Sequence, residues 1–387
     1  MPKKMLYGLI VLIAVAATII GLIALKPEQN TVINGIGAKV TFENPEIVRI
    51  LDEKYGITVN ILTNSGLDKF EQNGKVDYNG VDVIFGGSAS FADELKVKYP
   101  DGLPNSAGNP LRILEVKTVA QSPLLIHVKT ANGDLDAFLR AGIFTQNGNS
   151  YSISGDKLLS IINCSNANGD WNSIGVNIPG KCRFGFTNPN QSSGGRYTLS
   201  FIGSCQTNPE DPCSQTITVE QLPSVMESLM HAFDVSGKKP GDNDSVQFYY
   251  DWANSQSAAE RLMFAYESAP ISWLASPNVP ASFHDQASKS IALVYPEYTF
   301  MSTQVGVSLS DPGKRLVEIM TTDPDIIAAL NGEIGFRAGF GGNLPQVLPS
   351  INPNPSFTII PDPRADVTKA ITTEICTRWP ENPGCTK

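Results

Sequence analysis

Residues Cys182–Gly203 read CRFGFTNPNQSSGGRYTLSFIG, which is a short apolar run, a loop rich in hydroxyls and glycines, and an amphipathic run. The pattern predicts a strand over Cys182–Phe186, a turn, and a helix beginning near Arg196. In such a turn, free backbone N–H groups and the positive end of the helix dipole point at the same place. The residues positioned to hold a small polar or anionic group are Ser192, Ser193, Gly194 and Arg196. An ordinary helix with a capped N-terminus is the alternative interpretation.

The length and composition of the chain restrict the classes of protein it can represent. Its 387 residues exceed the usual size of one domain and predict two lobes. A formal net charge of −9 at pH 7 argues against a nucleic-acid partner, because a general nucleic-acid binder needs a basic face. The hydrophobic fraction of 41% is typical of a folded globular protein rather than a disordered one.

An uninterrupted apolar stretch near the N-terminus, Leu6–Leu25, is long enough to cross a bilayer. Two lysines precede it and Lys26 follows it, so the positive-inside rule places the N-terminus in the cytoplasm. We therefore expect residues 1–26 to form a transmembrane anchor. A cleaved signal peptide is the alternative, because Ala14-Val15-Ala16 has the small-residue pattern of a cleavage site. In both cases the body of the protein lies outside the cytoplasm, in the periplasm or at the cell surface.

Six cysteines fall into three neighbouring pairs along the sequence, and an even number in an exported chain is typical of disulfides. They are Cys164, Cys182, Cys205, Cys213, Cys376 and Cys385. The sequence alone does not choose among the possible connectivities. A zinc site is the alternative, but no Cys-x-x-Cys motif occurs and the three histidines are isolated from one another. We expect disulfides, and neither a metal nor a cofactor.

Short apolar runs alternate with amphipathic segments from Thr31 onward, which is the pattern of parallel α/β units. Strands are predicted at Thr31–Ile36, Ile57–Leu62 and Val81–Phe85, and each ends in small polar residues. Ligands of open α/β sheets bind beyond the carboxyl ends of the strands, so these ends predict a binding site. The candidate residues there are Gly35, Gly37, Asn64, Ser65, Ser88 and Ser90.

Two further β-rich runs, Leu111–Ala120 and Leu124–Lys129, are separated by Ser122-Pro123. A proline in that place suits a crossing between lobes better than the middle of a strand. The later segment Gly339–Pro363 is dense in glycine, proline and asparagine and predicts an extended wrap or linker. Asp366–Arg378 predicts a short helix.

Several motifs occur in the order known from one protein family. They are Asp82–Phe91 (DVIFGGSASF), Ser122–Val128 (SPLLIHV), Thr187–Gly195 (TNPNQSSGG), Tyr266-Glu267-Ser268, Val294–Thr299 (VYPEYT) and Gly335-Phe336-Arg337. In this order they resemble the type II periplasmic-binding-protein family, the bacterial solute-binding proteins related to the molybdate, sulfate and iron receptors of ABC transporters. The resemblance spans residues 31–340, and its weight comes from the order of the motifs rather than from any one of them.

The resemblance implies a two-lobed α/β fold with a hinge, preceded in this chain by the N-terminal transmembrane helix. The implied units are lobe 1 (residues 31–120 and 295–340), lobe 2 (residues 121–294) and a Pro-rich C-terminal extension (residues 341–387). Hinges are implied near Val119–Pro123 and Ser290–Pro296, with the solute held in the cleft between the lobes. The solute contacts that the resemblance adds are Ser122, Tyr266 and Glu267.

Departures from the family pattern leave the solute unnamed. The loop after the first strand, Asn34–Ala38, lacks the hydroxyls of the oxyanion receptors, and no tyrosine pair of the iron receptors stands near Val294–Thr299. Glu267 opposes a free anion unless it is paired, and a structural hydrogen bond is its alternative role. Ser88 and Ser90 are equally suited to capping the helix that follows them.

Other residues with chemical potential have structural interpretations. Tyr249, Tyr250 and Trp252 are expected to pack in a core rather than stack on a sugar. Arg337 is expected to fix the C-terminal helix to lobe 1 rather than to touch solute. Asp242 and Asp244 form too short a pattern for a calcium loop.

Catalytic motifs are absent from the sequence: it has no Gly-x-Ser-x-Gly, no His-Glu-x-x-His and no phosphate-binding Walker loop. We therefore expect a binding protein without catalytic activity, whose partners are a small solute or ion and a membrane permease. A surface sensor or scaffold that presents the same fold to a partner protein is the first alternative, and a secreted hydrolase is the second.

Overall fold

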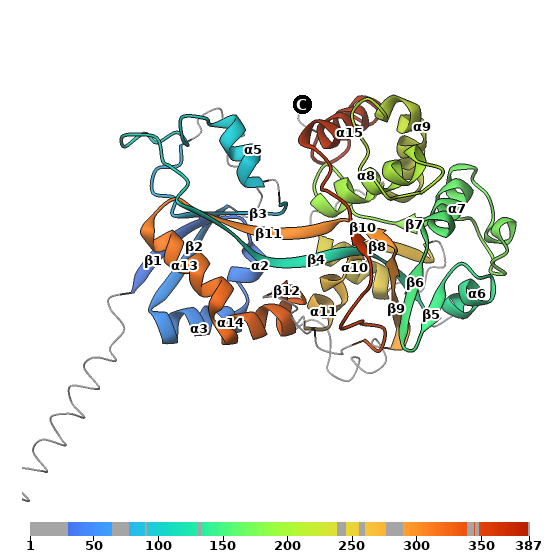
Figure 1. Ribbon diagram of the computed structural model, residues 1–387, viewed down its shortest axis with the longest axis horizontal. Helices are drawn as coiled ribbons and strands as arrows, with labels where there is room; N and C mark the ends of the chain where they lie inside the picture. The colour runs from blue at the N-terminus through green and yellow to red at the C-terminus, as the bar shows by residue number, and fades with distance from the viewer. Residues whose placement is uncertain are drawn as a thin grey trace, which may run out of the picture.

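The structure is a computed structural model that describes residues 30–63, 77–89, 91–130, 133–237, 245–254, 260–275, 289–338, 344 and 348–385. Two α/β lobes lie side by side, and long strands run from one to the other (Figure 1). We define lobe 1 as the described residues within 30–121 and 302–338, and lobe 2 as those within 124–300 and 344–385. The predicted anchor falls outside the described residues. Within them, none of the helices combines the length and apolar character needed to span a bilayer.

Lobe 1 is a sheet in the order β2-β1-β3-β11-β4, with β1 parallel to β2 and β3 and with β11 antiparallel to both of its neighbours. Its strands are β1 (Thr31–Ile36), β2 (Ile57–Thr63), β3 (Val83–Gly86), the first part of β4 (Glu115–Lys129), β11 (Met301–Ser308) and β12 (Arg337–Ala338). Its helices are α2 (Lys39–Phe42), α3 (Pro45–Tyr55), α5 (Phe91–Lys98), α13 (Asp311–Thr322), α14 (Pro324–Ala329) and η3 (Leu330–Ile334). Apolar clusters cover both faces of this sheet, which explains why all of β3 is buried.

Lobe 2 is built on the second part of β4, which pairs with β8 and β9. Its strands are β5 (Thr145–Asn147), β6 (Ser150–Ile153), β7 (Phe184–Gly185), β8 (Leu262–Tyr266), β9 (Ile291–Pro296), β10 (Tyr298–Thr299) and β13 (Thr358–Ile359). Its helices are α6 (Asp134–Arg140), α7 (Gly155–Asn166), η1 (Trp171–Ile174), α8 (Ser193–Thr207), α9 (Leu222–Ala232), η2 (Phe233–Gly237), α10 (Ser245–Asn254), α11 (Ser268–Ala275) and α15 (Ala365–Arg378). Residues of α7, α8, α9 and α15 share one apolar core, and residues of α10 and α11 belong to another.

The crossing between the lobes at Pro123 is confirmed, but the strand there is continuous. β4 is one strand of 15 residues, where the sequence predicts two runs. Its first part pairs with β11 as far as Pro123, and its second part pairs with β8 from Leu124. Proline has no N–H to donate, and it stands where the strand changes partners, so the ladder continues on either side.

A second crossing comes later in the chain than the hinge implied at Ser290–Pro296. All six residues of β9 are buried in the sheet of lobe 2, where β9 pairs with β4 and β6. The chain passes to lobe 1 only after β10, where it enters β11 at Met301. A fully buried apolar strand is a central strand of its own lobe, and its apolar residues do not mark the crossing.

Three disulfides join cysteines that neighbour each other in the sequence, which confirms the predicted bonds and settles their connectivity. They are Cys164–Cys182, Cys205–Cys213 and Cys376–Cys385. The first ties α7 to the segment before β7, and the other two close the loops that follow α8 and α15.

The C-terminal segment returns to lobe 2 and crosses its surface. We call residues 348–364 the strap; Figure 1 shows this red segment running over lobe 2 to α15. β13 of the strap pairs in parallel with β10. Helix α15, predicted at Asp366–Arg378, inserts Val367, Ile371 and Ile375 into the main core of lobe 2. The segment is therefore an integral part of that lobe.

Candidate functional site

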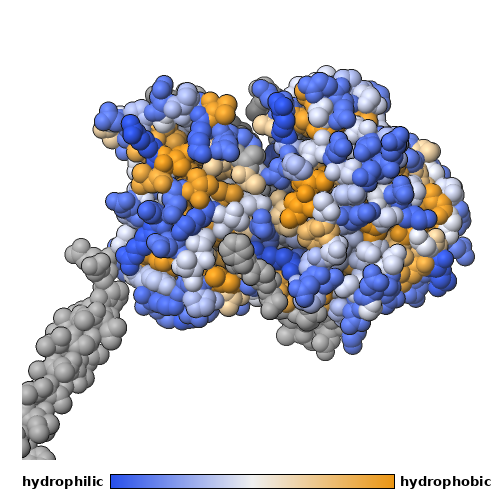
Figure 2. Space-filling model, viewed as in Figure 1, coloured by the Kyte–Doolittle hydropathy of each residue, from blue (hydrophilic) through white to orange (hydrophobic). Residues whose placement is uncertain are grey.

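The loop after β3 and helix α8 approach each other across the boundary between the lobes. One side chain of the strap, Asp362, contacts both: it accepts a hydrogen bond from the backbone N–H of Ala89 at 3.0 Å and lies beside Tyr197 of α8. Figure 2 shows the surface hollowed between the lobes at the top of the view. The candidate site is therefore the interlobe cleft, where a strand end of lobe 1 and a helix start of lobe 2 converge.

The predicted strand, turn and helix of Cys182–Gly203 are present, and the helix begins at Ser193, earlier than predicted. Ser192 caps it: the hydroxyl accepts from the Gly194 N–H at 3.2 Å and from the Thr187 hydroxyl at 3.0 Å. A Cβ on Gly195 would lie 2.1 Å from the Thr187 carbonyl oxygen. The glycine therefore lets the first turn of α8 lie against the loop backbone, a packing role that the sequence interpretation did not give it.

Tyr266, at the end of β8, joins α8 in one polar cluster. Its ring lies 3.4 Å from the Cβ position of Gly194, and its hydroxyl is buried. Burial raises the pKa of Tyr266 to about 12; the Ser193 and Ser302 hydroxyls and the Arg196 guanidinium act in the opposite direction. The phenol therefore keeps its proton at neutral pH and is available as a donor.

Arg196 supplies the positive charge of this cluster. Its guanidinium donates to the Pro189 carbonyl at 3.4 Å, and within the described parts of the chain it forms no ion pair. An arginine without a carboxylate partner beside a helix N-terminus makes this end of α8 electropositive. Of the predicted residues of lobe 2, the structure thus brings together Ser192, Ser193, Gly194, Arg196 and Tyr266.

Glu267 has a different role, because its carboxylate is fully buried and paired. It accepts from the Arg337 guanidinium at 2.7 and 2.8 Å and from the Tyr295 hydroxyl at 2.6 Å. Arg337 also donates to the Asn352 carbonyl of the strap at 2.7 Å. Burial raises the pKa of Tyr295, and the neighbouring Glu267 carboxylate raises it further. Glu267 therefore joins lobe 2, β12 and the strap, and its charge is neutralised.

Ser122 is also fully buried, at the point where β4 crosses between the lobes. Its hydroxyl accepts a hydrogen bond from the Ser268 N–H at 3.0 Å and so caps α11. We therefore reassign Ser122 and Glu267 from solute contacts to the crossing, because neither side chain has surface open to a solute. Arg337 holds the strap rather than the C-terminal helix that the sequence predicts, and Glu267 is the partner that the sequence did not reveal.

The lobe 1 candidates divide between strand ends and strand interior. Gly37 follows β1 in a left-handed conformation with φ of 81°, and Ser88 follows β3 beside Ala89. Gly35 lies within β1, where an added Cβ would meet the apolar side chains of Ile61 and Val83. Asn64, Ser65 and Ser90 lie outside the described residues.

Asp362 is the site residue that sequence reasoning missed. It lies in the segment predicted as a wrap, where its signal is local: it stands between Pro361 and Pro363. Proline fixes the φ angle, so two prolines hold the backbone around the aspartate stiffly. A stiff backbone holds the acidic side chain of Asp362 in a defined position.

The C-terminal disulfide loop, residues 376–385, contacts the loop that precedes α8. The Asn188 and Asn382 side chains form a reciprocal amide pair, at 2.9 and 3.2 Å. The Asn190 amide donates to the sulfur atoms of Cys376 and Cys385 at 3.0 and 2.9 Å. The loop that leads into α8 is thus held by the last described residues of the chain.

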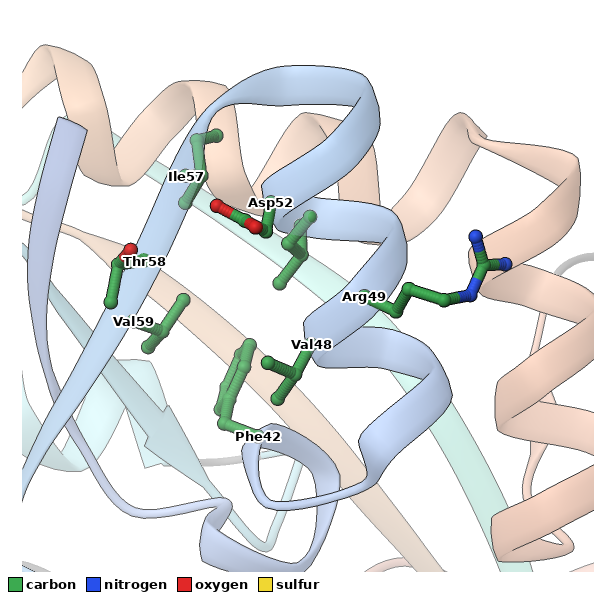
Figure 3. A pocket seen from close by; sticks show the side chains of 8 residues that line it. Phe42, Val48, Arg49, Asp52, Ile57, Thr58 and Val59 are labelled. Atoms are coloured by element: carbon green, nitrogen blue, oxygen red, sulfur yellow. The ribbon is translucent and has the colours of Figure 1, made fainter. Parts of the chain in front are cut away.

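A groove of about 320 Å³ in lobe 1 is lined by residues of α2, α3 and β2. Figure 3 shows Phe42, Val48 and Val59 converging on it from α2, α3 and β2, while Arg49 extends away from it. Arg49 is already paired with Glu46 and Glu53. Asp52 and Thr58 also line the groove, which therefore mixes apolar and polar side chains.

The remaining polar candidates lie in cores or outside the described residues. Tyr249 and Trp252 are buried in lobe 2, which confirms the predicted core packing for these two. Asp242 and Asp244 are not among the described residues. Within those residues, no group of three histidine, cysteine, aspartate or glutamate side chains is arranged to hold a metal ion.

No protein-family model and no curated protein sequence matches the chain. Solved structures do match it, among them a periplasmic thiamin binding protein, with 11% identity, 94% of this chain and 100% of that chain covered, and a TM-score of 0.53. A ferric ion-binding protein A of Pasteurella haemolytica matches with 10% identity, coverage of 92% and 98%, and a TM-score of 0.53. A Bordetella ferric binding protein matches with 10% identity, coverage of 90% and 98%, and a TM-score of 0.51. Two lobes joined by crossing strands agree with these likenesses, and the chain has the type II periplasmic-binding-protein fold.

Proposed function

We propose that the protein is a solute-binding protein outside the cytoplasm, which captures a small polar or anionic solute between its lobes for an ABC-type membrane permease. The observation that carries the proposal is the start of α8, where Arg196 stands without an ion-pair partner among the described residues. The proposal includes the membrane anchor at residues 6–25. Its three disulfides are typical of an oxidising, extracytoplasmic compartment.

The cleft groups are suited to a ligand that accepts hydrogen bonds. The start of α8 and the Arg196 guanidinium provide positive charge, and the Tyr266 phenol and Ser193 hydroxyl provide neutral donors. Glu267, which the sequence predicts to lie in the cleft and which would repel an anion there, is neutralised by its ion pair with Arg337. The site therefore favours a carboxylate, another oxyanion or a strongly polar neutral solute.

We propose no catalytic step for this protein. The buried carboxylate nearest the crossing is held in an ion pair, and His127 is a core residue bonded to Tyr249 and the Ala265 carbonyl. A buried histidine with these partners packs in the core and does not transfer a proton to a bound molecule. The solved structures with this fold that are named above are binding proteins, which supports the same interpretation.

A thermal-shift screen tests the proposal on the full-length protein in detergent. Oxyanions, metal ions, sugars and amino acids are added in turn, and a true ligand raises the melting temperature because it binds the folded state alone. Arg196→Gln should weaken binding of an anionic hit about 10- to 100-fold, since a charge-assisted hydrogen bond is lost. Arg315→Gln, which changes an exposed arginine on α13, is the matched control. A screen without any shift, or equal binding by both variants, contradicts the proposal.

A further inference from the structure

The strap is fixed to lobe 2 on both sides of Asp362. Before it, β13 pairs with β10, and the Thr216 hydroxyl donates to the Pro361 carbonyl. After it, Pro363 is buried and α15 packs into the core of lobe 2. The backbone on either side of Asp362 is therefore held by lobe 2.

The Asp362 side chain reaches from that backbone to lobe 1. Its carboxylate accepts the Ala89 N–H at 3.0 Å, in the turn that leads into α5. An anion is favoured there by a free backbone donor and by the positive end of the helix dipole. Ala89 and Asp362 are 273 positions apart in the sequence, and their bond ties lobe 1 to the strap of lobe 2.

The same carboxylate lies among the cleft groups of lobe 2. Burial raises the pKa of Tyr197, and Asp362 raises it further. Asp362 also raises the pKa of Tyr266, whereas Arg196 lowers it. A negative group of this chain thus already acts on the donors of lobe 2 that the proposed solute would use, and it already occupies the Ala89 N–H of lobe 1.

The surroundings of the Asp362 carboxyl favour its protonated form more than water does. Burial raises the pKa of this carboxyl and Glu94 of α5 raises it further, whereas the hydrogen bond from the Ala89 N–H opposes the rise without cancelling it. The contact therefore persists because the anchored strap keeps the side chain in place, a tethered group having a high effective concentration. A free anion with several oxygens can satisfy more of these donors at once.

We propose that Asp362 is an internal latch: its carboxylate takes the place of the solute's anionic group and holds the lobes together until a carboxylate or another oxyanion displaces it. The competition with solute rests on the function proposed above, whereas the contact across the cleft is the Ala89 hydrogen bond itself. In this arrangement the empty protein is already held closed, and the solute must open it before binding.

The test compares Asp362→Ala and the isosteric Asp362→Asn with Asp366→Asn, which removes an exposed carboxylate paired with Arg364 near the start of α15. Small-angle X-ray scattering of the full chain in detergent, without added anion, reports the separation of the lobes. Isothermal titration with malonate and with sulfate reports affinity. Circular dichroism checks that each variant is folded.

Asp362→Ala should increase the radius of gyration and bind malonate or sulfate about 10-fold more tightly than wild type, because one competing hydrogen bond is gone. Asp362→Asn should have a radius of gyration and an anion affinity between those of wild type and Asp362→Ala, since its amide oxygen still accepts from the Ala89 N–H but carries no charge. Asp366→Asn should match wild type in both measurements.

The outcomes separate the latch from the proposed function. Unchanged scattering in Asp362→Ala overturns the latch, even where an anion binds and the solute proposal stands. An open variant with unchanged affinity overturns the displacement. If Asp362→Ala opens and neither anion binds to any form, the link between the lobes is supported and the anionic solute is what fails.

Discussion

Replacing Arg337 by methionine should destabilise the protein strongly, because the change strands the Glu267 carboxylate in the interior. That carboxylate is fully buried, and two of its three hydrogen bonds, at 2.7 and 2.8 Å, come from Arg337. Removing one partner of a buried ion pair costs about 3–5 kcal/mol. Methionine keeps the length of the side chain, so the loss reports the charge rather than a cavity.

The bonds from Arg337 to the strap add to this loss. Arg337 donates to the carbonyls of Asn352 and Pro353 at 2.7 and 3.3 Å, and a hydrogen bond contributes about 1 kcal/mol. The expected decrease in the free energy of unfolding is therefore about 5–7 kcal/mol. Urea unfolding followed by tryptophan fluorescence is a suitable assay, because Trp252 and Trp273 are buried in the core that Tyr295 shares.

A double-mutant cycle with Glu267→Gln separates the ion pair from other effects of the substitution. The double variant should lose at least about 2 kcal/mol less than the sum of the single variants, because it leaves no unpaired charge. Arg49→Met, which breaks exposed ion pairs on α3, should leave stability unchanged within error. Additive losses, or a loss of under about 1 kcal/mol for Arg337→Met, refute the reasoning.

Three further outcomes are expected. Burial lowers the pKa of His127 to about 3, whereas in the unfolded chain it is about 6.5, so the free energy of unfolding should fall by roughly 2 kcal/mol between neutral pH and pH 5. Urea unfolding midpoints measured against pH test this. The same pH dependence in His127→Gln contradicts it. Gly195→Ala should cost about 1–3 kcal/mol in the same assay, because its Cβ meets a backbone carbonyl, whereas Gly87→Ala has open space and should cost under about 0.5; equal effects contradict the packing argument. Replacing Cys376 and Cys385 by serine should lower the free energy of unfolding by about 2–3 kcal/mol and weaken the binding of any solute found in the thermal-shift screen. Unchanged binding shows that the disulfide loop does not support the site.

Local elements could be predicted because their signals are local. The strand at Thr31–Ile36 and the helix beginning at Pro45 follow from apolar period and capping over a few residues. The strand end before α8 follows from the same kind of signal, and so do the disulfides between neighbouring cysteines. These features need no knowledge of what lies opposite them in the fold.

The partners of the site residues could not be predicted, because they come from distant parts of the chain. The sequence leaves Glu267 as either a solute contact or a structural hydrogen-bonding residue, and only the fold shows that Arg337, 70 positions later, neutralises it. Ser122 carries a hydroxyl whether it is open or buried, so its type does not reveal its exposure. Asp362 lies in a segment without hydrophobic periodicity, so the sequence pattern does not predict where this segment packs.

The amide pair between Asn188 and Asn382 has a consequence for biogenesis. These residues are 194 positions apart, so a chain made from N- to C-terminus presents the loop before α8 long before its support exists. Until α15 docks, the faces of α8 and α9 that receive Ile371 and Ile375 stay open to water. Such an intermediate exposes apolar surface and is prone to aggregation. Lobe 2 therefore matures only after its final helix has emerged, and a stop codon before Cys376 yields an unfinished lobe rather than a trimmed tail.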